Sequence, residues 1–369
     1  MSACSSYLIK NLYNLSLAKL LFPSIITFIF LIIFNSKIYT QPYMFDVEWN
    51  SNNDPVELIK IDLNSKSAYS FVNVTESFYQ HYEVPSNDWI VTINKFCEET
   101  VLYNINNPKK YIKIHSELGC FGGGFLFSKI LNKIYYFEGI FRDQEQLTSI
   151  NIKTKKNDSL LVIPYSYNQP LGNLEAFLSA DEKILYFNVA DTNYPPSIND
   201  KDFVYYFSTS KNEIIKKKRL YEFGYPKADG YLLHRGRQGK AIVQSFYNNK
   251  TKDSYYRLYD FDNNVGSNFI FYQGYTTPYY TGNGNLLFLA ETIDSAYDEL
   301  NTGKIFVYDL KTSKLTKTLN LLPRGEIYTF DNYPNDIYYI IDFYYDFRKI
   351  FKISMTPMTQ EISVIQTNK

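Results

Sequence analysis

The stretch Gly284–Leu322, GNLLFLAETIDSAYDELNTGKIFVYDLKTSKLTKTLNLL, decides the fold. It contains three short apolar runs, Asn285–Glu291, Lys304–Leu310 and Lys314–Leu321, which are rich in Leu, Ile, Val, Phe and Tyr. Gly, Asn, Asp and Ser residues separate the runs. Runs of this length and composition, bounded by turn-forming residues, are typical of β-strands. We therefore predict three consecutive strands joined by tight turns.

The same pattern recurs along almost the whole chain. Stretches equivalent to the one around Asp309 are spaced 42 to 57 residues apart, and they centre on Asp62, Asn104, Asn151, Ser208, Asp260 and Ser354. A polar residue followed by an apolar run recurs in phase with them, at Asp88, Lys133, Lys183, Lys240, Asn285 and Asp336. Repeats of this length with four short strands each indicate propeller blades. The sequence therefore predicts an all-β, seven-bladed β-propeller whose first blade is incomplete.

Two of the repeats carry specific turn motifs. Leu178–Phe187, LSADEKILYF, is similar to an S-x-D-G-K-x-L-Y turn, and Tyr308–Lys314, YDLKTSK, is similar to a Y-D-L-x-T-G-K hairpin. Glu182 and Ser313 occupy the glycine positions of these motifs. With these motifs, the chain from about Phe45 to Gln366 resembles YVTN-type and TolB-like propellers in general. The resemblance implies the propeller fold and no particular activity.

The N-terminus is interpreted as a targeting segment. Leu20–Phe34, LLFPSIITFIFLIIF, would span about 22 Å as a helix, short of a bilayer core of about 30 Å. We expect residues 1–40 to be a signal peptide, or alternatively a signal anchor, ahead of a single propeller domain at 41–369. Three glycosylation acceptor triplets agree with export; they begin at Asn73, Asn157 and Asn249.

Composition narrows the possible functions. The chain has 38 basic and 38 acidic residues, which argues against an electrostatic nucleic-acid binder. Aromatic residues make up 18% of it, which suits β-sheets. The basic run Lys216–Arg219 is expected on an outer strand of the fourth blade, where lysines deter unwanted strand pairing.

A disulfide is predicted from the propeller topology. Cys97 lies in the second loop of one blade and Cys120 in the loop that enters the next blade, so both belong to the same rim. An oxidising compartment would permit the bridge. The alternative is two unpaired cysteines.

Candidate binding residues were sought on this loop-rich rim. His81 and His115 are expected near this rim and His234 in an inner strand, so a His-based metal site or acid–base pair is conceivable. Solvated or core histidines are the simpler interpretation. The rim residues proposed as ligand contacts are His81, His115, Tyr79, Tyr82, Tyr279 and Tyr280. Four acidic residues in one predicted loop are candidates for a hard cation such as calcium, or else form a solvated loop: Glu291, Asp294, Asp298 and Glu299.

The sequence favours a binding module over an enzyme. We expect a secreted or cell-surface propeller that binds an extracellular protein or glycan, without a cofactor. A membrane partner is expected only if residues 20–34 are retained. The alternative is a hydrolase or lactonase-like enzyme with its site in the propeller channel, because fold alone does not choose between these classes.

Overall fold

The computed structural model describes most of the chain after residue 42. The described residues are 43–49, 55–62, 67–73, 78–83, 89–94, 99–115, 125–141, 144–164, 175–190, 202–223, 230–248, 253–294, 299–321, 323, 325–329, 336–343, 347–356 and 359–368. The chain divides into two units, Met1–Gln41 and Pro42–Lys369, and all the described strands belong to the second. The predicted targeting segment lies outside the described residues. Within them, no helix is long and apolar enough to span a bilayer.

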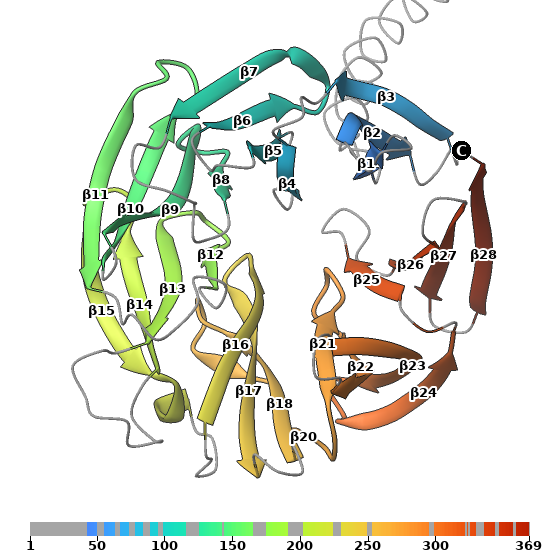
Figure 1. Cartoon of the computed structure of the whole chain (residues 1–369). Helices are drawn as coiled ribbons and strands as arrows, with labels where there is room; N and C mark the ends of the chain where they lie inside the picture. Colours follow the sequence, from blue (N-terminus) through green and yellow to red (C-terminus); the bar gives the residue numbers. More distant parts are fainter. Residues whose placement is uncertain are drawn as a thin grey trace, which may run out of the picture. The chain divides into compact units, whose positions relative to one another are not determined.

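The described strands form antiparallel sheets that follow one another in chain order (Figure 1). The first sheet has three strands: β1 (Tyr43–Trp49), β2 (Pro55–Asp62) and β3 (Ser67–Asn73). The second and third have four each: β4 (Phe78–Glu83), β5 (Trp89–Asn94), β6 (Glu99–Asn104), β7 (Asn107–His115), β8 (Leu126–Ser128), β9 (Lys133–Phe141), β10 (Gln144–Asn151) and β11 (Asn157–Pro164). Each sheet is a simple meander, as the repeat predicts.

Four further sheets complete the described part. The fourth sheet comprises β12 (Ala176–Leu178), β13 (Ile184–Ala190), β14 (Asp202–Ser208) and β15 (Glu213–Arg219), followed by the 3-10 helix η2 (Leu220–Phe223). The fifth comprises β16 (Gly230–Arg237), β17 (Lys240–Asn248), β18 (Asp253–Asp260), β19 (Val265–Gly266) and β20 (Ile270–Tyr272). The sixth and seventh comprise β21 (Thr276–Tyr280), β22 (Leu286–Asp294), β23 (Glu299–Asp309), β24 (Lys314–Asn320), β25 (Gly325–Thr329), β26 (Asp336–Phe343), β27 (Phe347–Thr356) and β28 (Thr359–Asn368). The described unit is therefore all-β. Strands of this unit end at the predicted repeat centres Asp62, Asn104, Asn151, Ser208, Asp260 and Asp309.

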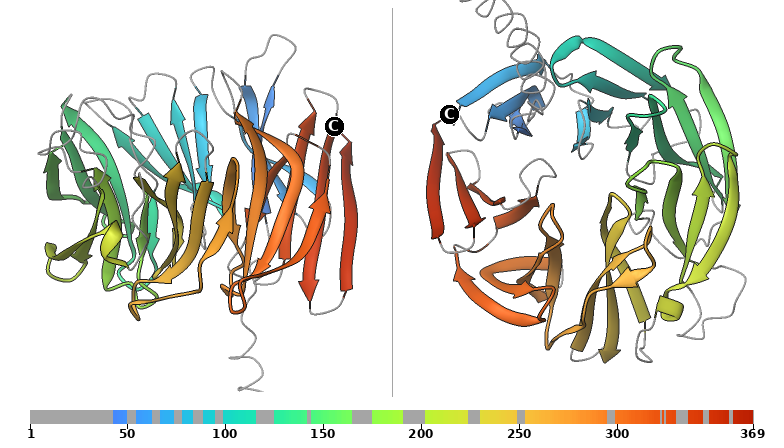
Figure 2. Two further views of the ribbon diagram at one scale, coloured as in Figure 1. Left: turned by 90° about the horizontal axis from the view of Figure 1, so that it is seen from below. Right: turned by 180° about the vertical axis from the view of Figure 1, so that it is seen from behind.

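Each interior sheet buries both of its faces. In the fifth sheet, Tyr231 and Leu233 of β16 pack toward the fourth sheet, whereas Ile242 of the neighbouring β17 packs toward the sixth. Six buried hydrophobic clusters lie between consecutive sheets, one for each neighbouring pair from the first and second to the sixth and seventh. Figure 2 shows the same succession of sheets from behind. Because sequential sheets cover one another, no separate layer of helices is needed to bury their apolar side chains.

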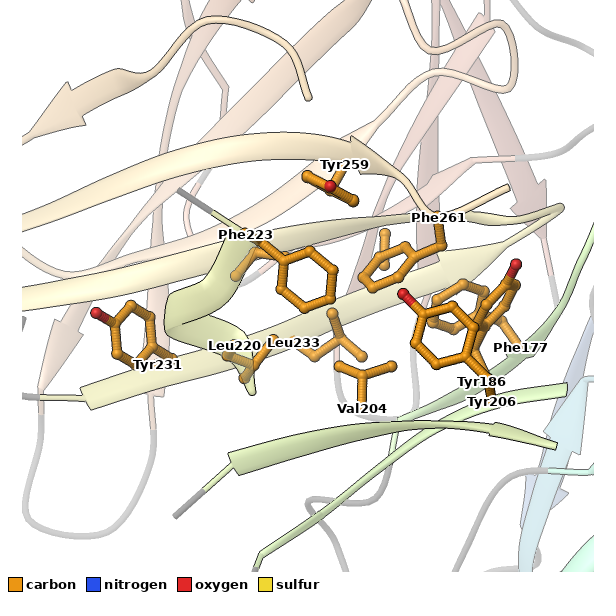
Figure 3. Packing of buried hydrophobic residues seen from close by; sticks show 12 residues of the cluster. Phe177, Tyr186, Val204, Tyr206, Leu220, Phe223, Tyr231, Leu233, Tyr259 and Phe261 are labelled. Carbon is orange, nitrogen blue, oxygen red and sulfur yellow. The ribbon is translucent and has the colours of Figure 1, made fainter. Parts of the chain in front are cut away.

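Aromatic rings dominate the cluster between the fourth and fifth sheets (Figure 3). The ring centroids of Phe177 and Phe261 are 5.4 Å apart, and those of Phe223 and Tyr259 are 4.6 Å apart; both pairs meet edge to face. Such pairs contribute about 0.5–1.5 kcal/mol beyond the burial of their apolar area. Tyr and Phe side chains thus contribute much of the packing between these two sheets.

The turns that follow the innermost strands have a common construction. Asp181 accepts hydrogen bonds from the Ser179 hydroxyl at 2.8 Å and from the Lys183 amide at 3.1 Å. In the sixth sheet, Asn283 accepts from the Thr281 hydroxyl at 2.7 Å and from the Asn285 amide at 2.9 Å. A short polar side chain at this position thus closes the turn.

Glu182 and Ser313, which replace glycine in the two motifs, keep the backbone conformation that glycine favours. Their φ angles are 58° and 56°, in the left-handed region. Glu182 gains a contact in return: its carboxylate accepts hydrogen bonds from the Ser128 hydroxyl at 2.8 Å and from the Ile130 amide at 2.9 Å. Both donors belong to the third sheet. The glutamate therefore joins two sheets, a role that a glycine cannot fill.

A second carboxylate joins the fourth and fifth sheets. Asp262 accepts hydrogen bonds from the Ala180 amide at 2.8 Å and from the Tyr186 hydroxyl at 2.7 Å. Gly239 is required beside it, since its φ is 73° and a Cβ there would lie 2.3 Å from a carboxylate oxygen of Asp262. A carboxylate on the inner turn of the fourth sheet and another on the turn after β18 thus each join two neighbouring sheets.

We predict opposite effects for glycine at the two positions of positive φ. Ser313→Gly should raise the free energy of unfolding by up to about 1 kcal/mol, because it relieves the left-handed backbone. Glu182→Gly should lower it by about 1–3 kcal/mol, because the loss of the hydrogen bonds to the third sheet outweighs the same relief. Urea unfolding of the two variants and the parent measures the difference. Equal shifts in both variants would contradict the proposed inter-sheet role of Glu182.

Candidate functional site

The predicted modification sites fall into two groups. Asn73 ends β3 and Asn157 begins β11; both strands are outermost in their sheets, and both asparagines are exposed. These positions suit glycan attachment, which remains a prediction. Cys97, Cys120 and Asn249 lie outside the described residues.

The predicted rim residues do not form one exposed surface. Tyr279 and Tyr280 belong to the innermost strand β21, and only 8% and 2% of their surfaces are exposed. Tyr280 donates a hydrogen bond to the Lys240 carbonyl at 3.1 Å and lies under the Arg237 guanidinium, 4.5 Å from its ring centroid. Tyr280 therefore joins the fifth and sixth sheets, whereas Tyr279 packs in the cluster between the sixth and seventh. Their proposal as exposed ligand contacts is corrected.

The other rim candidates are placed by their strands alone. The structure assigns Tyr79, His81 and Tyr82 to β4, an innermost strand, and His115 to the end of β7, an outermost strand. Their side chains are not among those described. His234 lies on the innermost strand β16, as expected.

The acidic candidates are not gathered in a flexible loop. Glu291 and Asp294 belong to β22, Glu299 begins β23, and Asp298 lies outside the described residues. Asp294 and Glu299 are cross-strand partners. Among the described residues, no three His, Cys, Asp or Glu side chains are grouped closely enough to hold a metal ion. The predicted location in a loop is therefore corrected, because the strands extend further than the sequence indicated.

Glu291 instead takes part in a contact between the fifth and sixth sheets. Its carboxylate accepts hydrogen bonds from the Tyr272 hydroxyl at 3.2 Å and from the Thr302 hydroxyl at 3.0 Å. The Lys304 ammonium is 3.5 Å away. Burial, followed by the charge of Glu291, raises the pKa of Tyr272, so this phenol stays protonated and donates.

A chain of hydrogen bonds, which we call the His234 network, links the fifth and sixth sheets. It consists of His234, Gln244, Ser254, Tyr256 and Thr276. A ring nitrogen of His234 lies 2.8 Å from the Gln244 side-chain oxygen. The Gln244 amide nitrogen donates to Ser254 at 3.0 Å and to Tyr256 at 3.1 Å. The Tyr256 hydroxyl then meets the Thr276 hydroxyl of the sixth sheet at 2.6 Å.

Strand register explains how these residues come together. Gln244 is opposite Leu232 in β16 and opposite Tyr256 in β18, so these side chains share one face of the fifth sheet. Thr276 is the cross-strand partner of Glu291, which places the His234 network beside the Glu291 contact. The residues are separated by tens of positions in the sequence. Only the alternation of the strands signals their common face, and no motif marks the network.

The inner end of the network is accessible. His234 is half-buried, and Leu232 on the same face is 38% exposed, whereas Gln244, Ser254 and Tyr256 are buried. Gln244 fixes the orientation of the imidazole, which can donate or accept a hydrogen bond. An oriented imidazole beside an exposed leucine, both on a rigid strand, can offer a ligand one polar and one apolar contact.

Comparisons with known proteins support the fold. No protein family and no curated protein matches the sequence. Among solved structures, an oligogalacturonate lyase from Vibrio parahaemolyticus is 8% identical with a TM-score of 0.57, covering 86% of this chain and 98% of that one. Sqt1 from Saccharomyces cerevisiae is 12% identical with a TM-score of 0.53, covering 88% and 82%. TolB from Acinetobacter baumannii is 11% identical with a TM-score of 0.46, covering 78% and 67%.

The similarities to the lyase and to Sqt1 confirm the β-propeller fold that the repeat and its turn motifs predict. At such low identity they concern the fold alone. Evidence for the function therefore comes from the residues of this chain, above all from Leu232 and His234 on β16.

The His234 network should contribute measurably to stability. Tyr256→Phe removes the hydroxyl that contacts Gln244 and Thr276, and should lower the free energy of unfolding by about 1–3 kcal/mol, because buried polar groups lose a partner. Tyr308→Phe is the matched control, since Tyr308 packs against the same core without a hydrogen bond from its hydroxyl to any described residue. It should change stability by less than about 0.5 kcal/mol. Thermal and urea unfolding compare the two variants, and equal losses would contradict the assigned role.

Proposed function

We propose that the protein is a secreted or cell-surface binding module whose ligand is an extracellular protein or carbohydrate. The observation that carries the proposal is the arrangement on β16, where the exposed Leu232 adjoins the oriented His234. The carboxylates Glu182, Asp262 and Glu291 accept hydrogen bonds that join neighbouring sheets. A rigid surface with fixed apolar and polar contacts suits recognition.

The same proposal includes the closure of the ring, the role of the N-terminus, the glycans and a disulfide. The sheets are the seven blades of one closed ring at 41–369, with a first blade of three strands. Residues 1–40 direct export as a signal peptide or a signal anchor. Asn73, Asn157 and Asn249 carry glycans. Cys97 and Cys120 form a disulfide between adjacent blades.

The second candidate function is an enzyme of the hydrolase or lactonase-like kind with a site in the propeller channel. His234 is then the described residue suited to proton transfer, because it lies on an innermost strand with its ring oriented by Gln244.

One experiment separates the two functions. The secreted protein is tested for binding on an array of glycans and extracellular proteins, and for turnover of a panel of esters, lactones and oligosaccharides. We expect binding that falls at least tenfold in Leu232→Asp, because an ionised side chain disrupts the apolar contact. Leu315→Asp is the matched control, since Leu315 is 49% exposed on the outermost strand β24 and its replacement should leave binding unchanged.

Thermal unfolding of both variants shows whether they remain folded. Turnover that disappears in His234→Ala, with no ligand retained on the array, would overturn the binding proposal in favour of the enzyme. Equal loss of binding in Leu232→Asp and Leu315→Asp would show that Leu232 is not part of the binding site.

Export has its own test. Expressed in a eukaryotic secretory host, the protein should be processed near residue 40 and should carry N-glycans that peptide-N-glycosidase F removes. Replacing Asn73, Asn157 and Asn249 with Gln one at a time should each remove one mobility step on a gel. A protein that stays in the cytoplasm without glycans would contradict the proposed location.

A further inference from the structure

The outermost strand of the fourth sheet carries a ridge of positive charge. Strand β15 has the sequence EIIKKKR and, in the described sheet, pairs only with β14. We call its last four residues, Lys216–Arg219, the basic ridge. The strand is exposed over most of its length. Because side chains alternate along a strand, Lys216 and Lys218 project from one face of the sheet edge and Lys217 and Arg219 from the other.

Aromatic rings of the protein hold these cations in place. The Lys216 ammonium lies 5.0 Å from the ring centroid of Tyr206, and that of Lys218 lies 4.2 Å from Phe223. On the other face, Lys217 and Arg219 lie 4.8 Å and 4.9 Å from the ring of Phe203. Figure 3 shows Tyr206 and Phe223 within the core between the fourth and fifth sheets. Contact with ring faces restricts the long side chains, which lowers the entropy lost when they bind an anion.

The lysines of the ridge are not neutralised by the described part of the protein. Earlier in the same hairpin, Lys211 pairs with Glu213 at 3.7 Å. For Lys216, Lys217 and Lys218, by contrast, no carboxylate of a described residue lies within ion-pair distance. Glu222 is near, and it accepts a hydrogen bond from the Arg219 backbone amide at 3.3 Å. Burial, and then the charge of Lys216, lower the pKa of Lys218, as expected where positive charges are crowded.

We propose that the basic ridge binds an anionic polysaccharide, a glycan that carries sulfate or carboxylate groups along its length. The proposal deepens the carbohydrate-binding alternative of the proposed function and relies on it for the extracellular location. Cations on both faces of a sheet edge require a ligand with repeated charges and enough flexibility to follow the edge. Charge complementarity between the four cations and the ligand supplies the attraction.

Two other polyanions fit the ridge less well. An acidic peptide would have to pair with the strand edge, but the β14–β15 register shifts between Tyr206 and Phe207, which shortens the regular edge. An anionic membrane is flat, whereas the charges of the ridge point to both sides of the sheet. Both remain as contrary outcomes of the test.

The test uses heparin as the sulfated probe and polygalacturonate as the carboxylated probe. The ridge variant carries Gln at Lys216, Lys217, Lys218 and Arg219. Its control carries Gln at Lys153, Lys155 and Lys156, an exposed basic turn between β10 and β11, with Lys133→Gln added so that both variants lose four charges. Binding is measured by calorimetry and by salt elution from a heparin column, and folding by thermal unfolding.

We expect the parent and the control to bind at least one of the two probes with similar affinity. The ridge variant should bind at least tenfold more weakly and elute at lower salt, because screening weakens the charge contacts. Equal weakening in the control would overturn the proposal, as would binding to phosphatidylserine vesicles or to a poly-glutamate peptide but to neither polysaccharide. Export of the ridge variant and its binding on the glycan and protein array test the proposed function separately from the ridge.

Discussion

Burial of the sheet faces is the constraint on which the rest of this structure depends. A meander of short strands exposes two apolar faces, and neither can be left in water. The described sheets solve this by covering one another in chain order, so each interior sheet contributes to two clusters. Removal of apolar surface from water stabilises each cluster by about 25 cal/mol per Å². The aromatic content of the sequence follows from this, since flat rings fill the space between twisted sheets efficiently.

Polar contacts then determine which sheet faces which. Apolar packing alone tolerates small slides between neighbouring sheets, whereas a hydrogen bond to a carboxylate does not. Glu182 ties the third and fourth sheets, Asp262 the fourth and fifth, and Glu291 the fifth and sixth. These three carboxylates therefore serve a structural role, because each accepts at least one hydrogen bond from a neighbouring sheet. Functional chemistry must be sought where side chains are oriented and still accessible.

The sequence predicted local structure well because local structure depends on near neighbours. Alternation and turn residues located the strands, and the motif around Asp181 forms the predicted turn, closed by hydrogen bonds to the Asp181 carboxylate. Contacts between distant strands were not predictable in the same way. Gln244 and Thr276 are joined through Tyr256, and nothing in their local sequence indicates it. Tyr280 illustrates the same limit. A tyrosine exposed on the rim and a tyrosine buried on an inner strand look alike in the sequence.

The two proposed binding surfaces follow from the geometry of the fold. Side chains in the middle of a sheet are covered on both faces, so accessible side chains lie on parts of the innermost strand β16 and of the outermost strand β15. Leu232 and His234 occupy the first kind of edge, and the basic ridge occupies the second. The inner edge offers an oriented imidazole beside an apolar side chain, which suits a compact group of defined shape. The outer edge offers closely spaced charges braced by rings, which suits an extended polymer. The inner edge therefore recognises a ligand by shape and the outer edge by charge. Residues at either edge can be substituted without disturbing the core between them.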